Sequence, residues 1–504
     1  MSKRRGILSA LLLVLMLAAI VLYSMGRSQR AEEEVFDEEN TVVIWYADEA
    51  MTNFLSSAAL SYSKNSSVKI RPVLVSAVDF LEHVNDASVR EDSEEAMPDL
   101  VIMTNDNLEK AYLAGLAAEI ADGGFWVNEE NYPKAALSAV SYHDRYVGYP
   151  FYFETALLLY NETYMEQLAQ KTIEQELITE EFEAASGDDR DAEPETDVTK
   201  VPDVSQEQIE DKIGVIIPST IDDILSFADE YDAPEQVEAV FRWDVSDIFY
   251  NYFMVGQYMN VGTDTGDDPE QIDIYNEDTI ACLKVYQNLN QFFSIDAKET
   301  SYDSILQEFM EGKTVFTVAT TDAISKLERA KESGEFTYDY GVTTLPDVSP
   351  ERGSRTLSVT NAIVVNGYSD KKAVANDFAK YLAYDTAQEL YDRTDKIAAR
   401  KNVTYKNDNI NAALREYENS VPLPKMLETS NFWVQLEICF TNIWNGADVN
   451  ASLKELSEQI KTQVTGTEYV EEPIAEPVPE TQEDDAEEDQ EQDNADTEAS
   501  SGAD

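Results

Sequence analysis

The sequence predicts an α/β fold built around a mainly parallel sheet, and the spacing of its first segments leads to this expectation. Residues 41–46 (TVVIWY) are a β-branched and aromatic run typical of a buried strand, and similar runs recur at 68–74 and 99–103. Helical patterns separate them at 51–63 and 80–85. Strands that alternate with helices at this spacing are typical of parallel sheets.

Polar loops follow the first and third of these strands. Tyr46 ends the first strand and is followed by Ala47-Asp48-Glu49, while Asp106 and Asn107 lie just beyond the third. Ligands of such sheets bind beyond the carboxyl ends of the strands, so both loops are candidate binding loops. Neither has a glycine-rich phosphate cradle, and both are also compatible with ordinary capping of the helices that follow.

The segment 146–161 (YVGYPFYFETALLLYN) is the second candidate binding element. Its alternation places Tyr149, Phe151 and Phe153 on one face of a strand. Glu154 is then a lone carboxylate among apolar and aromatic neighbours, where desolvation without a partner is costly. We expect either a site that stacks and hydrogen-bonds a polar ligand, or a core strand whose Glu154 is satisfied by a backbone amide.

The rest of the body continues the mixed pattern, but two acidic segments interrupt it. Residues 178–211 are acidic with few large apolar side chains, and residues 466–504 combine proline with a high acid content. Both are predicted to be disordered because they cannot bury a core. Further helices are expected at 108–117, 164–177, after Pro218, 279–293, 373–382, 387–391, 432–444 and 451–464, and further strands at 312–319, 340–345 and 358–365.

Composition excludes several classes of function. The chain has 504 residues, with Asp+Glu 99 against Lys+Arg 37 and a formal net charge of −62, so phosphate-directed binding of nucleic acid is excluded. Cys282 and Cys439 lie far apart without a CxxC motif, which argues against a disulfide framework and a thiolate zinc site. Buried thiols are expected, with a single disulfide as the alternative. With only two histidines and no EF-hand pattern at 264–268, we expect neither a metal nor a cofactor.

The N-terminus predicts export from the cytoplasm. Lys3, Arg4 and Arg5 precede an apolar run at 7–25, which is long enough to span a bilayer as a helix. Positive charge on its amino side places the body of the protein outside the cytoplasm. We interpret residues 1–30 as a retained signal anchor, with cleavage as a signal peptide as the alternative. Residues 31–40 then form an acidic linker.

Five stretches in order carry a family resemblance. They are TVVIWYADE (41–49), PDLVIMTNDNLEKAYLAGLAAEI (98–120), FETALLLYN (153–161), EGKTVFTVATTDAISKL with YGVTTLPDV (311–348), and SNFWVQLEICFTNIWNG (430–446). Together they resemble extracellular solute-binding proteins of the sugar type, the maltodextrin-binding class of ABC-importer receptors.

This resemblance implies a periplasmic-binding-protein-like fold, in which two α/β lobes close on a ligand held between them. Residues 41–152 with 347–395 would form lobe one, and residues 153–346 with 396–465 would form lobe two, which carries the acidic insertion. The implied partners are a sugar ligand, the permease subunits of an ABC importer and the membrane. The receptor would be a monomer without catalytic residues, and it would not be an enzyme.

The resemblance also implies ligand-binding residues. Glu154 matches the family's hinge-strand acid, Glu49 and Asp106 fall where sugar-binding relatives carry acids, and Trp433 matches an aromatic platform on the second lobe. Tyr46 completes the first binding loop.

Other positions depart from the maltodextrin pattern. Met103 and Asp322 stand where maltodextrin receptors have tryptophans, and Asn107 and Glu437 stand where they have arginines. Of these, Asn107 and Asp322 are retained as expected ligand-binding residues. A pocket with fewer rings favours a shorter or different saccharide. A surface sensor or adhesin with this fold, and a carbohydrate-active enzyme with paired carboxylates, are the alternatives.

Overall fold

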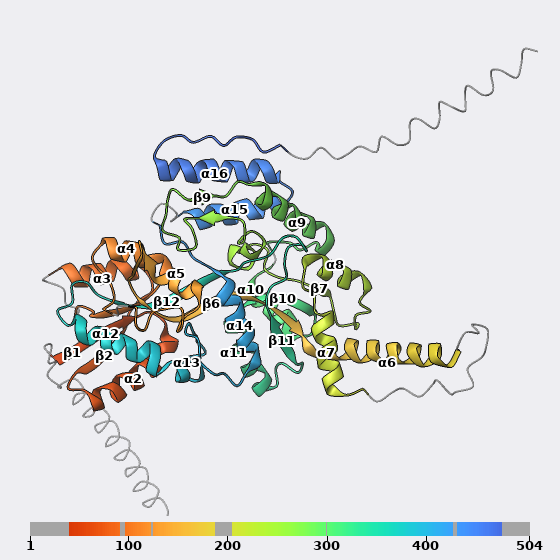
Figure 1. Cartoon of the computed structure of the whole chain (residues 1–504), viewed down its shortest axis with the longest axis horizontal. Coiled ribbons are helices and arrows are strands. Elements are labelled where there is room, and N and C mark those ends of the chain that lie inside the picture. Colours follow the sequence, from red (N-terminus) through yellow and green to blue (C-terminus); the bar gives the residue numbers. More distant parts are fainter. Residues whose placement is uncertain are drawn as a thin grey trace, which may run out of the picture.

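A single long strand, β6 (Tyr149–Asn161), connects the two halves of the molecule. The first half of β6 pairs antiparallel with β12 (Leu357–Val365), whereas its second half pairs antiparallel with β10 (Thr314–Thr320) and β11 (Tyr340–Thr343). The resulting strand order is β2-β1-β3-β12-β6-β10-β7. Figure 1 shows β6 running between a group of elements at the left, around β1 and β2, and a second group around β10 and β11.

The computed structural model describes residues 40–90, 96–121, 124–186, 204–298, 300–426 and 431–475. The expected N-terminal membrane helix lies outside these residues. Within them, no helix is both long enough and apolar enough to cross a membrane.

The N-terminal half has the expected parallel arrangement. Strand β1 (Thr41–Tyr46) lies between β2 (Lys69–Leu74) and β3 (Leu100–Thr104) and is parallel to both. β12 then adds antiparallel to β3. The helices of this half are α2 (Thr52–Asn65), α3 (Phe80–Val89), α4 (Leu108–Leu113), α5 (Lys134–Val140), α12 (Lys372–Lys380), the π-helix η6 (Tyr381–Asp385) and α13 (Ala387–Thr394).

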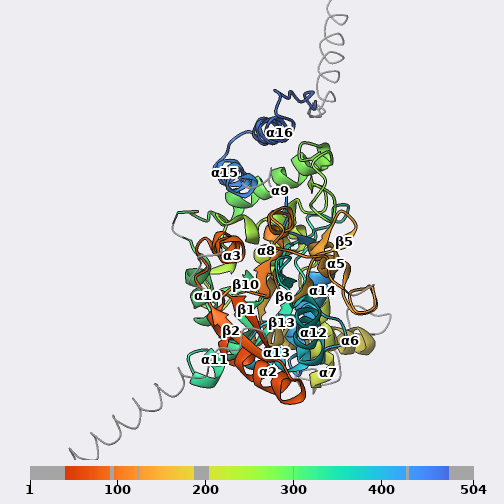
Figure 2. The same cartoon turned by 90° about the vertical axis from the view of Figure 1, so that its left-hand side faces the viewer.

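The second half carries its helices around β10, β11 and β7 (Ala239–Phe241), with a separate helical group at one end that both views place together (Figures 1 and 2). The helices around the strands are α6 (Glu162–Ser186), α7 (Gln206–Ile216), α8 (Ile221–Glu230), α10 (Tyr302–Met310), α11 (Asp322–Ser333) and α14 (Asp408–Asn419). The group at the end is α9 (Glu277–Phe293), α15 (Phe432–Trp444) and α16 (Val449–Thr465).

Short elements complete the chain. The short strands are β4 (Ser141–Tyr142), β5 (Arg145–Tyr146), β8 (Asn260–Val261), β9 (Ile272–Asp273), β13 (Ile397–Ala398) and β14 (Val421–Pro422), and the one-turn helices are η2 (Glu49–Met51), η3 (Asn105–Asn107), η4 (Ile248–Tyr250) and η5 (Tyr252–Met254).

The alternation of side chains along β6 separates two apolar cores. Leu157 and Leu159 join the core that extends from β1 and β3 to α11, while Ala156 and Leu158 join the core of α6 to α9, α15 and α16. Successive side chains of a strand point to opposite faces, so one strand contributes to both cores. The crossing strand is therefore fixed on both sides.

The expected disorder at residues 178–211 is wrong at both ends of that segment. Helix α6 continues to Ser186, and α7 begins after a capping box at Ser205. Ile209 and Ile213 are buried, and Lys212 pairs with Glu176 across the two helices at 2.6 Å. Ile209 and Ile213 lie four residues apart on one face of α7, a spacing that extends beyond the end of the acidic segment. Residues 187–203 lie outside the described part.

The expected disorder of the tail is also wrong over its first ten residues. Gly466 ends α16 with φ +66°, and the following residues contact that helix. The Glu471 carboxylate accepts hydrogen bonds from Lys461 and Ser457, each at 2.6 Å, and Ile474 N–H donates to the Tyr275 hydroxyl. These few hydrogen bonds and ion pairs are enough to fix residues 466–475 against the helix, although the composition of the segment is polar. Residues 476–504 lie outside the described part.

The two cysteines are free and buried, as the pattern of their segments predicted. Burial raises the pKa of both Cys282 and Cys439 to about 12, so neither thiol is reactive near neutral pH.

Candidate functional site

A cavity of ≈ 410 Å³ opens at the carboxyl ends of β1 and β3 and along β6. This is the position at which open parallel sheets bind their ligands. Its lining combines two carboxylates with amide, hydroxyl, aromatic and aliphatic side chains. The lining residues are Tyr46, Ala47, Asp48, Met51, Ala77, Phe80, Ile102, Met103, Thr104, Asn107, Tyr152, Glu154, Val359 and Asn361.

The two loops that follow β1 and β3 hold their side chains through local hydrogen bonds. Asp48 caps η2 by accepting from Ala50 N–H through Oδ1 at 3.0 Å, and its other oxygen, Oδ2, pairs with Lys396. Asn107 donates to the Thr104 hydroxyl at 3.0 Å, and that hydroxyl donates to the Asp106 carboxylate. Both loops are therefore pre-organised for binding.

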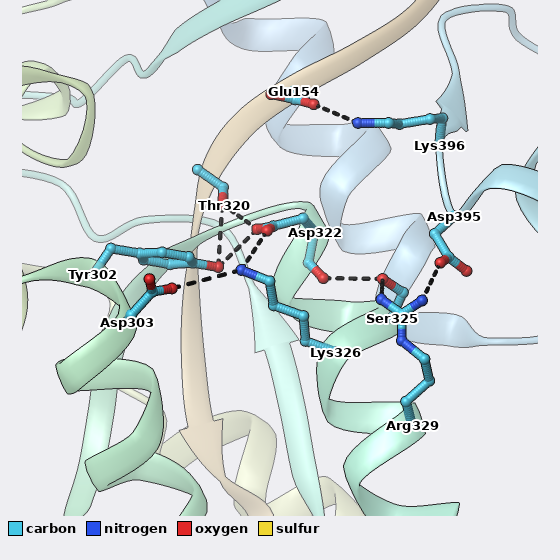
Figure 3. A network of polar contacts seen from close by, with 10 residues as sticks. All are labelled: Glu154, Tyr302, Asp303, Thr320, Asp322, Ser325, Lys326, Arg329, Asp395 and Lys396. Carbon is cyan, nitrogen blue, oxygen red and sulfur yellow. Dashed lines mark hydrogen bonds and ion pairs between the residues drawn. The ribbon is translucent and has the colours of Figure 1, made fainter. Parts of the chain in front are cut away.

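Lys396 connects the two carboxylates of the cavity. Its Nζ lies 3.0 Å from Glu154 Oε1 and 3.1 Å from Asp48 Oδ2, and 5.5 Å from the centre of the Tyr152 ring. Figure 3 shows this side chain reaching across to Glu154 on the crossing strand. Burial lowers the pKa of Lys396, but the carboxylates of Glu154 and Asp48 outweigh it and raise that pKa above its usual value.

A second charged cluster lies where β10 ends, next to the same part of β6. Thr321 N–H donates to Thr155 C=O at 3.2 Å, which places Asp322 close to the segment that carries Glu154. Asp322 accepts from Tyr302 at 2.7 Å and pairs with Lys326 at 2.7 Å. The cluster thus has an acid and a base of its own.

The electrostatics of this second cluster follow from its contacts. Burial raises the pKa of Asp322, but hydrogen bonds from Lys326, Thr320 and Tyr302 outweigh it and hold that pKa below its usual value. Burial and the Asp322 carboxylate raise the pKa of Tyr302. At neutral pH the tyrosine is therefore a neutral donor to an ionised acid, as drawn in Figure 3.

Asp395 and the residue after it connect the cavity with helix α11. Asp395 ends α13 in the left-handed conformation with φ 61°, and its carboxylate accepts from Arg329 of α11 at 2.6 Å. Lys396 is the next residue. Two consecutive side chains thus contact α11 on one side and the cavity acids on the other (Figure 3).

The structure brings three of the expected ligand-binding residues into the cavity, namely Tyr46, Asn107 and Glu154. Asp106 lies beside it, bonded to Thr104 and Asn107. Glu49 is exposed on η2 and does not line it.

Two expected residues belong to the second half of the molecule. Asp322 lies in the cluster at the end of β10. Trp433 is half-buried on α15, where its ring packs 5.8 Å from that of Tyr252, and it does not line the cavity.

Sequence reasoning missed Asp48 and Lys396. Asp48 is the acid next to Glu49, and its place as the N-cap of η2 decides which of the two neighbours faces the cavity. Lys396 lies 242 residues from Glu154 in the chain, so no local pattern connects them. Among the described residues, no group of His, Cys, Asp and Glu side chains could hold a metal ion.

The sequence model of one protein family, described as bacterial extracellular solute-binding protein, matches residues 73–413. This match covers more than half of the chain, from β2 to α14. The chain belongs to this family. The expected assignment to extracellular solute-binding proteins is therefore confirmed.

Relatives of this solute-binding protein are distant in sequence. The maltodextrin-binding protein MdxE of Bacillus subtilis is 22% identical over 239 residues, which cover 44% of this chain and 54% of that protein. The aligned region thus spans about half the length of this curated relative.

Solved structures show the same fold. The extracellular solute-binding protein of Staphylococcus aureus, in complex with maltose, matches with a TM-score of 0.64 at 20% identity, covering 84% of this chain and 98% of that one. The maltose-binding periplasmic protein MalE of Listeria monocytogenes, also in complex with maltose, gives 0.62 at 19% identity, covering 86% and 100%. The α/β, periplasmic-binding-protein-like fold is confirmed by these matches.

Proposed function

We propose that this solute-binding protein captures a neutral sugar or short oligosaccharide between two closing lobes and delivers it to an ABC importer. The observation that carries the proposal is the cavity at the carboxyl ends of β1 and β3, with Asp48 and Glu154 on its wall. Relatives with this fold are named for maltose or maltodextrin and two were solved with maltose, which supports a sugar as the ligand class.

The cavity offers the two kinds of contact that a sugar needs. Carboxylate oxygens of Asp48 and Glu154 accept hydrogen bonds from ring hydroxyls, and charge-assisted bonds of this kind are the stronger ones. Tyr46, Tyr152 and Phe80 provide aromatic surface for the apolar faces of the ring. The small number of aromatic rings in the cavity lining and the small volume of the cavity favour a short saccharide.

We place the second contact surface on the other side of the crossing strand. Asp322, next to the Glu154 segment, and Trp433 on α15 would meet the ligand when the lobes close around it. The proposed division is residues 41–152 with 347–395, and 153–346 with 396–465. Replacement of Trp433 by alanine should then weaken sugar binding by about 1 kcal/mol, and calorimetry that finds equal affinity would remove Trp433 from the site.

The setting that we propose follows from the family. A receptor of this kind works outside the cytoplasm as a monomer, held at the membrane by residues 1–30, and meets the permease subunits of its importer. Co-purification of the full chain with a two-subunit permease tests this arrangement. A sensor or adhesin would bind sugar without such a partner.

The test of the binding function is calorimetry on the full chain with maltose and maltotetraose, followed by a panel of other neutral saccharides. Glu154→Gln and Asp48→Asn should each weaken binding at least about tenfold, because each removes a charged acceptor. Glu49→Gln is the matched control, since Glu49 is exposed and outside the cavity lining. Binding that depends on Glu49 instead of Glu154 would contradict the assignment of the cavity.

The same experiment separates a receptor from an enzyme. We propose that bound sugar is recovered unchanged, because Asp48 and Glu154 both pair with the ammonium of Lys396 and are not arranged as a separate proton donor and nucleophile. Release of shorter sugars by the wild type, abolished in Glu154→Gln, would favour a carbohydrate-active enzyme.

A further inference from the structure

The ammonium of Lys396 lies close to two carboxylates and one aromatic ring. Glu154 Oε1 lies at 3.0 Å, Asp48 Oδ2 at 3.1 Å, and the Tyr152 ring centre at 5.5 Å, within the range of a cation–π contact. The side chain is 20% exposed. Lys396 is therefore paired with both acids of the cavity wall.

The backbone on both sides of Lys396 is fixed. Lys396 N–H donates to the Thr394 hydroxyl at 3.2 Å, and that hydroxyl donates to Leu390 C=O at 2.7 Å. Ile397 pairs with Phe153 on the crossing strand. The ammonium is thus positioned by the same strand that carries Glu154, and its position does not depend on side-chain packing alone.

Among the residues that the structure describes, the cavity is lined by two acids, Asp48 and Glu154, and by no lysine or arginine. Both acid oxygens lie next to the same nitrogen, so they are within about 6 Å of each other. Without a cation between them, the two carboxylates would repel each other, and together they would attract a positively charged group of a ligand. With the cation in place, the two acids remain side by side as acceptors for neutral hydroxyl donors.

We propose that Lys396 is the residue that sets the charge class of the ligand. It positions Asp48 and Glu154 as paired acceptors for a neutral polyhydroxyl ligand and takes the place that the ammonium of an aminosugar would otherwise occupy. An aminosugar would then be disfavoured because the carboxylates that could pair with its ammonium are already paired with Lys396. The inference rests on the proposed sugar function and extends it to a residue outside the cavity lining.

The test compares two disaccharides on the full chain by calorimetry. Maltose is the neutral probe, and the dimer of glucosamine is the cationic probe. Lys396→Met keeps the length of the side chain without its charge, and should shift the ratio of the two affinities towards the glucosamine dimer by about tenfold or more. Lys396→Arg keeps the charge and should retain the preference of the wild type. Equal preferences in Lys396→Met and wild type would overturn the inference.

A measurement without ligand separates this inference from the proposed function. Unfolding by urea should show that Lys396→Met is destabilised, and that adding Glu154→Gln restores part of the loss by removing one of the two repelling charges. Additive effects of the two changes would overturn the positioning role. If this coupling is found but the wild type binds neither probe nor any neutral saccharide, the sugar function and its charge selectivity fail together, and the positioning of the acids stands.

Discussion

Charged groups at the cavity and charged groups in the interior are held in opposite ways. At the cavity, Lys396, Glu154 and Asp48 are partly exposed, and the one ammonium is paired with both carboxylates. In the interior, Glu416 and Lys425 are almost completely buried, and their hydrogen-bond partners are uncharged groups. The comparison separates the ions that lie at the cavity from those that connect buried segments of the fold.

Glu416 of α14 connects the segments that cross between the two halves. Its carboxylate accepts from Leu345 N–H at 3.0 Å and from the Thr356 hydroxyl at 2.9 Å, and the Thr155 hydroxyl donates to Thr356 at 3.0 Å. Burial raises its pKa to about 7, against the lowering effect of these hydrogen bonds, and Asp347 adds a smaller increase. One side chain thus joins α14, β6 and the segment between β11 and β12.

Lys425 is a buried positive charge that also connects distant segments of the chain. Its Nζ donates to Ser138 C=O of α5 at 3.0 Å and to Thr265 C=O. Burial lowers its pKa to about 8, although Asp267 and Glu109 act to raise it. Burial among neutral partners moves both interior groups towards neutrality, whereas the acids around Lys396 keep it charged.

The largest expected effect comes from Glu416. Its folded pKa of about 7 exceeds its ordinary value of 4.5, so the native state binds the proton more tightly and stability falls as pH rises through 7. Between pH 5 and 8 this group should cost about 2.5 kcal/mol of unfolding free energy. Urea unfolding at both pH values should show this loss reduced by that amount in Glu416→Gln.

The control for Glu416 lies on the same helix. Glu418 is exposed and pairs with Lys401 at 3.5 Å, so Glu418→Gln should keep the pH dependence of the wild type. A Glu416→Gln protein whose stability changes with pH as steeply as the wild type would show that Glu416 is ionised in the fold at both pH values.

Lys425 should change the unfolding free energy with pH in the opposite direction and by a somewhat smaller amount. Its folded pKa of about 8 lies below its ordinary value of 10.5, so the native state binds fewer protons and stability rises with pH in this window. From pH 7.5 to 9.5 the gain should be about 2 kcal/mol, and Lys425→Met should lack it. The exposed Lys134, paired with Asp264, supplies the control Lys134→Met, measured by urea unfolding. A gain that persists in Lys425→Met would assign it to other groups.

These interior groups also mark what sequence could and could not predict. Strands such as 41–46 and the helix at 432–444 were predicted with their correct bounds, because each carries its whole signal within a few residues. Glu154 was identified because it is the one acid in an apolar strand. Glu416 has no such contrast, because it lies among other charged residues, and its role appears only through burial against a distant segment. Lys425 is the one charge in the apolar run 421–427, but its partners come from distant segments that the local sequence does not indicate.

The same reasoning explains the errors at the candidate site. Glu49 and Asp48 are neighbours of equal charge, and only the cap of η2 distinguishes them. Lys396 depends on the pairing of β13 with β6, which is a property of the folded chain. Local patterns therefore predicted the polar loops that follow β1 and β3, and tertiary structure decided which side chains enter the cavity.

The pair of Lys461 and Glu471 sharpens the comparison, because these two opposite charges are largely but not completely buried and are paired with each other. The two side chains are 18% and 12% exposed and lie 2.6 Å apart, and Ser457 also donates to the carboxylate. Glu471→Gln should lower the unfolding free energy by about 1 kcal/mol in urea, since one charged acceptor is lost. Glu472→Gln, at the exposed neighbour, should have no measurable effect. Equal stability of both variants would mean that the segment after Gly466 contributes nothing through this pair.

The smallest effect on stability is expected at Asp322, which is 39% exposed and belongs to the cavity side of the comparison. Its lowered pKa means that its stabilising contribution is present near neutral pH and is lost as pH falls through the acid range. After solvent screening, Asp322→Asn should cost only about 0.5 kcal/mol of unfolding free energy at pH 7. The control is Asp303→Asn, because Asp303 is 90% exposed and lies 3.9 Å from Lys326. If Asp322 meets the sugar on closure, its replacement should weaken maltose binding severalfold while stability hardly changes. A variant that loses stability but keeps its affinity would place Asp322 with the structural ions instead.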